Sequence, residues 1–174
     1  MEIKLKEVLI FILLVFLSSV AIIYYNRSSK NSNKVENKKY AILVSNSTEY
    51  YKVVGMTEKF VQNSNKNSLS NLLSLIDEDY KSEKKINSKN VFKFVTDLSD
   101  ARYTFSNATI YYKKISSRLK KYYVKGSIIK QSFSEDEENI EYYVVVNVDS
   151  KNNTFSIIPD NGNLFKEATK WYLN

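Results

Sequence analysis

The sequence predicts an α+β domain preceded by a membrane-spanning helix. Three observations lead to this fold class: an uncharged apolar run near the N-terminus, apolar residues at helical spacing up to residue 98, and apolar residues at every second position from residue 102 onward. Helices followed by consecutive strands are typical of helices packed on an antiparallel sheet. We therefore expect a transmembrane helix, then three helices packed on one face of a curved antiparallel sheet of about four strands.

The apolar run covers residues 8–25, which contain no charged side chain. Roughly 20 such residues are needed for a helix to cross the hydrocarbon core of a bilayer. The run ends in Tyr24 and Tyr25, which suit the aromatic belt of a membrane interface. We expect an uncleaved anchor. The alternative is a cleaved signal peptide that releases a secreted domain, because Ser19, Val20 and Ala21 resemble a small-residue cleavage site.

Residues 26–39 consist mainly of Asn, Ser and Lys without hydrophobic periodicity, which indicates a flexible polar linker. The folded domain is then expected over residues 40–174. A short basic N-terminus that leads directly into the apolar run is typical of an export signal-anchor. We expect a single-pass protein of the cell membrane with an extracytoplasmic domain, although the larger number of Lys and Arg residues after the run favours the opposite orientation.

Three helices are expected before residue 100. Asn46 followed by Glu49 is an N-cap signature that predicts a helix over residues 47–62. A second helix is expected where apolar residues recur at one helical face, namely at Leu69, Leu72, Leu73, Ile76 and Tyr80. A third is expected after an N-cap at Ser88, with the apolar residues Val91, Phe92, Val95 and Leu98. The apolar run at residues 40–44 fits either a strand or a helix.

Four strands are expected after residue 101. The first two cover residues 102–114 and 119–133, and the second of them contains Gly126. The third presents Ile140, Tyr142, Val144, Val146 and Val148 on one face. The fourth covers residues 154–158 and is expected to end at Pro159, before a turn at residues 160–162.

The composition excludes several kinds of chemistry. The chain has no cysteine and no histidine. Thiolate nucleophiles, disulfides, imidazole bases and nearly all zinc and copper sites therefore drop out. We expect no enzymatic activity, no cofactor and no metal site.

The formal net charge of +7 is concentrated in residues 1–39, where seven Lys and Arg face three acids. Such an excess beside an apolar segment favours anionic lipid headgroups. Within the domain, no acid occurs between residues 101 and 134, and basic residues crowd the predicted turn between the first two strands. We expect this cluster to protrude: Lys113, Lys114, Arg118, Lys120 and Lys121. It is interpreted first as a solvated face that guards the sheet edge against aggregation, next as a surface for a polyanion or a protein partner, and last as one for nucleic acid.

Over residues 48–158, the order of expected helices and strands resembles that of the NTF2-like or cystatin-like superfamily. The segments that carry this resemblance are NSLSNLLSLIDEDY and SKNVFKFV, followed by YYVKGSII, IEYYVVVNVD and TFSIIPD. With the N-terminal anchor, the chain also resembles the VirB8-like assembly proteins of conjugation and secretion machines. That resemblance implies a bitopic protein with an NTF2-like domain outside the cytoplasmic membrane. No residue-level motif of that family matches, so no functional residues are carried over.

Two functions are compatible with these observations. The first is a non-catalytic interaction or assembly module that binds itself or other envelope proteins. The second is a small-ligand-binding or enzymatic NTF2-like domain with a pocket inside the cone of the sheet. The candidate polar residues for such a pocket are Asp97, Asp100, Tyr103, Tyr111 and Tyr142. A filled concave face would favour the first function, and a deep pocket the second.

Overall fold

The computed structural model describes residues 40–99, 102–131 and 138–172. Five antiparallel strands lie side by side in chain order. They are β1 (Ile42–Leu43), β2 (Arg102–Lys114), β3 (Leu119–Gln131), β4 (Glu138–Asp149) and β5 (Thr154–Asp160). The helices are α2 (Ser47–Asn63), α3 (Leu69–Leu75), α4 (Glu78–Lys84) and α5 (Asn163–Thr169), with the 3₁₀ turns η1 (Lys66–Ser68), η2 (Val91–Lys93) and η3 (Lys170–Tyr172).

The expected α+β class is confirmed, but the described residues form five strands and four α-helices instead of four and three. The extra strand is the short β1, and the extra helix is α5. Among these residues, no helix is long and apolar enough to cross a membrane. The predicted anchor at residues 8–25 and the linker at residues 26–39 lie outside the part of the chain that is described.

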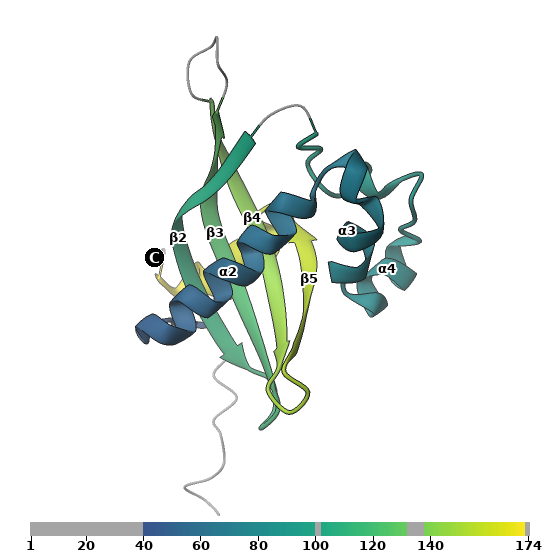
Figure 1. The fold of residues 1–174 in the computed structure, drawn as a ribbon. Helices are drawn as coiled ribbons and strands as arrows, with labels where there is room; N and C mark the ends of the chain where they lie inside the picture. The colour runs from purple at the N-terminus through teal and green to yellow at the C-terminus, as the bar shows by residue number, and fades with distance from the viewer. Residues whose placement is uncertain (1–39, 100–101, 132–137, 173–174) are drawn as a thin grey trace, which may run out of the picture. The chain divides into compact units, whose positions relative to one another are not determined.

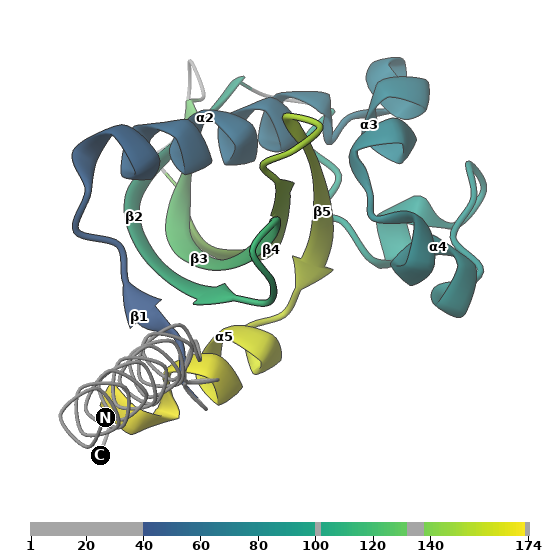
Figure 2. The ribbon, with the colours of Figure 1, turned by 90° about the horizontal axis from the view of Figure 1, so that it is seen from below.

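The sheet curves around α2, which lies across its concave face (Figures 1 and 2). The inward side of α2 is buried, and it carries Val53, Thr57, Phe60 and Val61. These residues meet every second residue of the long strands, and the strand side of this core includes Ile110, Val124, Ile128, Val144 and Val146. Phe60, Thr57 and Val146 have no exposed surface at all. The core of the domain therefore occupies the hollow of the sheet.

The helix predicted over residues 47–62 is confirmed as α2. Its N-cap is Asn46, whose Oδ1 accepts a hydrogen bond of 2.9 Å from the Glu49 amide. At the other end the Ser64 hydroxyl donates to the Phe60 carbonyl over 2.8 Å, which satisfies a carbonyl that has no partner within the last turn.

The prediction of one continuous second helix is wrong. The segment forms two short helices, α3 and α4, with a break between them. Ile76 adopts an extended backbone (φ −74°, ψ 138°) and forms a parallel bridge with Ile157 of β5. The next amide, that of Asp77, donates to the Ile157 carbonyl over 2.9 Å. Ile76 is buried as its spacing predicted. However, it covers the edge of β5 instead of continuing a helix.

The third expected helix is also wrong, since only η2 forms there. In this segment, the Asn90 side chain forms hydrogen bonds with backbone groups. Asn90 Oδ1 accepts from the Asn87 amide over 2.8 Å, and Asn90 Nδ2 donates to the Lys85 carbonyl over 3.0 Å. Such local bonds compete with helix formation. Asn90, not Ser88, precedes the turn, while Val91 still reaches the core.

The strands follow the prediction closely, with one correction. β5 does not stop at Pro159 but continues to Asp160, which pairs with Tyr143. A proline is tolerated there because β5 is the last strand of the sheet and one side of its backbone needs no donor. The turn after Asp160 contains Gly162 in a left-handed conformation (φ 93°), which a residue with a side chain adopts only with strain.

α5 follows this turn and packs on the convex face of the sheet (Figure 2). The Phe165 ring lies 5.8 Å from the Tyr111 ring and 5.6 Å from the Tyr143 ring, measured between centroids. Both tyrosines point away from the α2 side. The expectation that all helices share one face is therefore wrong: α2 fills the concave face, α5 covers part of the convex face, and α3 and α4 lie beyond the edge at β5 (Figure 1).

Gly126 permits the tight approach of β3 to Phe105. A Cβ built on Gly126 would lie 2.4 Å from two carbons of the Phe105 ring, which is buried and packs edge-on against Tyr142. We predict that Gly126→Ala lowers the free energy of unfolding by about 1–3 kcal/mol through overpacking. Urea denaturation of a fragment that starts at Lys38, where this compact unit begins, measures the change.

The matched control is Gly55→Ala in the middle of α2. A Cβ at Gly55 would meet nothing within 4 Å, so alanine should raise stability by about 0.5–1 kcal/mol through its better helix propensity. Equal stability changes in the two variants would show that Phe105 moves freely away from β3.

Candidate functional site

The five basic residues predicted as a surface are separated by the alternation of the β2–β3 hairpin. Lys113 pairs with Lys121 across the strands, and Lys114 pairs with Lys120. Because neighbouring residues of a strand point to opposite faces, Lys113 and Lys121 lie on the convex side. Lys114 and Lys120 lie on the same side as α2. The hairpin thus divides the cluster between two faces.

Lys120 does not protrude, contrary to expectation. Its Nζ lies 2.6 Å from Glu49 Oε1 in the first turn of α2, and the Tyr122 hydroxyl donates to the same oxygen. Burial alone would raise the pKa of Glu49, but the hydrogen bonds from Lys120 and Tyr122 lower it. In turn, burial and the Glu49 carboxylate raise the pKa of Tyr122. Lys120 therefore helps to hold α2 on the sheet.

Arg118 is also engaged. Its Nε donates to both oxygens of Asp149 over 2.9 Å, and its Nη2 lies 2.6 Å from Oδ2. The hydrogen bonds from Arg118 lower the pKa of Asp149 to about 2. The acids that neutralise Arg118 and Lys120 are distant in the sequence, so the local absence of acids was misleading. Among the residues that the structure describes, Lys113, Lys114 and Lys121 form no ion pair.

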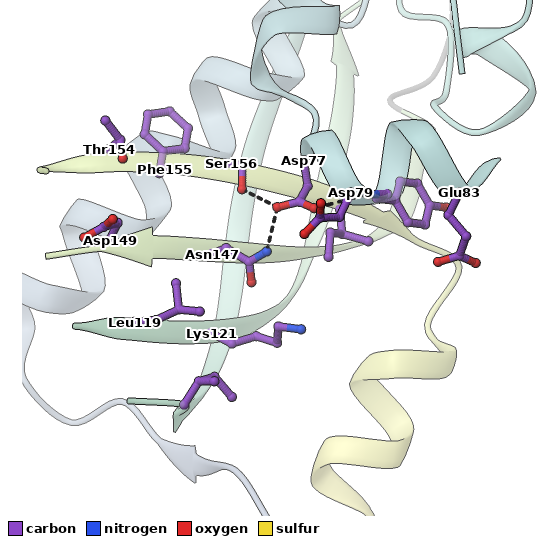
Figure 3. Close-up of a pocket in the computed structure, with 13 residues that line it drawn as sticks. Asp77, Asp79, Glu83, Leu119, Lys121, Asn147, Asp149, Thr154, Phe155 and Ser156 are labelled. Carbon is purple, nitrogen blue, oxygen red and sulfur yellow. Dashed lines mark hydrogen bonds between the residues drawn. The ribbon is translucent and has the colours of Figure 1, made fainter. Parts of the chain in front are cut away.

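A groove lies on the convex side of the sheet, between α4 and the outward residues of β3, β4 and β5 (Figure 3). Its first part is a cavity of about 480 Å³. A second cavity of about 970 Å³ extends toward the start of α5 and shares part of the lining, namely Tyr80, Glu83, Lys121 and Ile158. We call the two together the convex groove.

Asp77 lines the first cavity of the convex groove. As N-cap of α4, its Oδ1 accepts from the Tyr80 amide over 3.3 Å. Its Oδ2 accepts from the Ser156 hydroxyl over 2.7 Å and from Asn147 Nδ2 over 3.0 Å (Figure 3). Lys121, Asn147 and Ser156 form one cross-strand row on the convex face. Asp77 thus ties α4 to β4 and β5.

The hydrogen bonds also set the ionisation of Asp77. Burial would raise the pKa of Asp77, but the bonds from Ser156, Asn147 and the Tyr80 amide, with the positive charge of Lys121, lower it. Asn147 Oδ1 is buried and accepts no hydrogen bond in the described part of the chain.

The charge of the groove is mainly acidic at the end near α4. Asp77, Asp79 and Glu83 line the first cavity there, with Lys121 as the basic residue. Asp149 lines the other end of this cavity and is paired with Arg118 (Figure 3). In the described ranges, no group of three or more acids is arranged to hold a metal ion. The arrangement suits polar and charged groups of a partner more than a polyanion.

The polar residues proposed for a pocket inside the cone do not converge. Asp97 accepts from Ser99 and lies 3.1 Å from Lys66 in a surface loop. Tyr111 packs against α5 on the convex side, whereas Tyr142 is buried in the core beside Phe105. Tyr103 packs at the margin of this core. Asp100 lies outside the described residues.

No protein-family model, curated protein or solved structure matches the chain. Function is therefore inferred from the fold and its surfaces. The resemblance to NTF2-like, cystatin-like and VirB8-like proteins stays a proposal.

Asp77 was not predicted as a central residue, although part of the signal is present in the sequence. An aspartate N-cap followed by two acids is typical of the start of a helix, and basic residues in the last turn are typical of its end. Asn147 and Ser156 are the polar residues of alternating strands. Their meeting with Asp77 depends on the break at Ile76, which periodicity does not reveal.

We predict that Asp77→Asn lowers the free energy of unfolding by about 1–2 kcal/mol at neutral pH. Asparagine keeps the N-cap but removes the ionised acceptor that Ser156 and Asn147 share. The folded pKa of Asp77 lies below the unfolded value of about 3.9. Its contribution is therefore complete above that pH and is lost as the pH falls through the folded pKa.

Urea denaturation of both proteins at neutral pH and at acidic pH measures this difference. The gap between wild type and variant should shrink as the pH falls below about 4. The control is the exposed neighbour Asp79→Asn, which should change stability by less than about 0.5 kcal/mol. A gap independent of pH would mean that the carboxylate charge does not hold α4.

Proposed function

We propose that the protein is a membrane-anchored extracytoplasmic interaction or assembly module without catalytic activity. The observation that carries this proposal is the filled concave face. Val53, Thr57 and Phe60 of α2 are at most 2% exposed and occupy the hollow in which a cone-shaped domain would hold a small ligand. Space for a partner lies instead on the convex side.

The convex groove has the mixed chemistry of a protein-binding surface. Ile158 and Leu164 contribute apolar surface, while Glu83, Lys84 and Asn163 contribute polar groups along its second cavity. Interfaces that form and dissociate are typically about as apolar as the rest of a protein surface, with polar rims. A segment of another envelope protein, or of a second copy, is therefore a suitable occupant.

The arrangement of elements supports a relationship to the NTF2-like or cystatin-like superfamily. A helix precedes a curved antiparallel meander and packs across its concave face (Figure 2). Together with an anchor at residues 8–25, this arrangement is compatible with a VirB8-like role in a conjugation or secretion apparatus. The anchor and the extracytoplasmic orientation rest on the sequence alone.

The basic residues keep a narrower role in this proposal. Arg118 and Lys120 are held by Asp149 and Glu49. Lys113, Lys114 and Lys121 are then the members of the predicted surface that are available to a polyanion or a partner. Nucleic acid is the less suitable ligand, because Lys121 faces the acidic end of the convex groove.

Site-specific photo-crosslinking in intact cells tests the proposal. We predict that a crosslinker at Glu83 or Asn163, both exposed and lining the groove, gives adducts of discrete mass in the membrane fraction. A crosslinker at the exposed Lys52 of α2 is the matched control and should give none. Equal labelling from both faces, or none from the groove, would contradict an interaction surface there.

The mass of the chain from the same membranes tests the anchor separately. An uncleaved chain keeps residues 1–25 and resists extraction by alkaline carbonate. A mature N-terminus at Ile22, with the domain in the soluble fraction, would show that the segment is a signal peptide.

A further inference from the structure

Trp171 is the single tryptophan of the chain, and it is exposed. Its exposed fraction is 67%, and its ring stacks on Tyr40 with centroids 5.0 Å apart and an angle of 14° between the planes. Large aromatic side chains are usually buried in a soluble domain, because otherwise they expose much apolar surface to water. The two stacked rings therefore offer an apolar face to a contact outside the domain.

The stacked rings mark the point where the chain enters the domain. Tyr40 is the first described residue and lies two positions before β1. The next amide, that of Ala41, donates to the Ala168 carbonyl at the end of α5 over 3.1 Å. This bond and the stacking hold Trp171 beside the first residue after the predicted linker.

The length of the linker limits the distance between these rings and a bilayer. Residues 26–39 separate the predicted anchor from Tyr40. A flexible chain of this length spans about 20 Å, and a fully extended one at most about 50 Å. Tyr40 and Trp171 are therefore confined to a shell close to the membrane surface, wherever the rest of the domain points.

Basic and apolar side chains accompany the two rings. A cavity of about 200 Å³ is lined by Tyr40, Leu164, Lys113 and Lys170, with Glu167 as its acid. Leu164 is 39% exposed. Tryptophan and tyrosine favour the interface of a bilayer, where the apolar ring meets the acyl chains and the polar atom meets water. Lysines beside them are attracted to anionic headgroups.

We propose that these residues form a docking surface for an anionic lipid bilayer. The surface, which we call the aromatic tip, comprises Tyr40, Lys113, Leu164, Lys170 and Trp171. The inference rests on the proposed membrane anchor, because the anchor brings the tip within reach of the headgroups. Leu164 also lines the second cavity of the convex groove, so docking of the tip would orient the domain and leave the end of the groove near α4 to face partners.

The fluorescence of Trp171 reports directly whether the aromatic tip contacts lipid. The full-length chain is reconstituted into liposomes that contain anionic lipid, with either ordinary or brominated acyl chains, and is washed with alkaline carbonate to confirm insertion. Bromine quenches tryptophan only at contact range. We expect Trp171 to lose most of its emission in the brominated liposomes and to be shielded from acrylamide added in water.

A matched variant moves the reporter to the other side of the domain. Tyr51 on α2 is 70% exposed, close to the exposure of Trp171. However, α2 lies on the concave face, whereas α5, which leads directly into the turn with Trp171, lies on the convex face (Figure 2). In the double variant Trp171→Phe, Tyr51→Trp, the emission should be unchanged by brominated lipid and accessible to acrylamide.

Charge variants test the role of the lysines. Lys113→Gln and Lys170→Gln should each lower the ratio of docked to undocked tip about fivefold, since each lysine near an anionic surface contributes about that factor. Lys89→Gln, in the loop after α4, is the control and should have no effect. The loss should be absent in liposomes of neutral lipid.

The outcomes separate this inference from the proposed function. If the chain inserts but Trp171 is unquenched by brominated lipid and fully open to acrylamide, the tip does not dock and only this inference fails. Shielding in native membranes but not in pure lipid would also overturn it, in favour of a protein partner. If the chain does not insert, the anchor and the inference fail together.

Discussion

The packing of α2 in the hollow of the sheet is the interaction on which the rest of the structure depends. A strongly curved antiparallel sheet leaves its concave face open to water unless an element fills it. Phe60 of α2 has no exposed surface. Full burial of a large apolar side chain of this kind stabilises the folded state by about 1.5–3 kcal/mol. The close approach of Phe105 to Gly126 belongs to the same core. The helix and the curvature therefore stabilise each other.

Two carboxylates fix the positions of α2 and α4 on the sheet. Glu49 in the first turn of α2 binds Lys120 and Tyr122 of β3, and Asp77 at the start of α4 binds Asn147 and Ser156 of β4 and β5. Both carboxylates are partly buried and have a lowered pKa. Charged hydrogen bonds of this kind are directional, whereas apolar packing alone allows a helix to slide. They fix which surfaces of the domain are covered and which stay open.

Much of the fold could be predicted because it depends on local signals. The N-cap at Asn46 and the alternation of the long strands are visible within a few residues, and the structure confirms them. The break at Ile76 could not be predicted, because a buried residue has the same spacing in a helix as in a segment that bridges to β5. The site was predicted less well. Arg118 and Lys120 are neutralised by acids 31 and 71 residues away, and no local pattern reveals such pairs.

Because the concave face is filled, the convex groove and the aromatic tip are the surfaces that we propose for function. This conclusion holds only if α2 is a permanent part of the core, as the burial of Thr57 and Phe60 indicates. A helix that swung out would open a pocket in the cone and would favour the alternative of a ligand-binding domain.

Native-state hydrogen exchange of the domain measures this most directly. The amides in the middle of α2 should exchange only through global unfolding, with the same opening free energy as the central amides of β3 and β4. A distinctly lower opening free energy for α2 than for these strands would show that the helix leaves the sheet in the folded state, and would contradict the account.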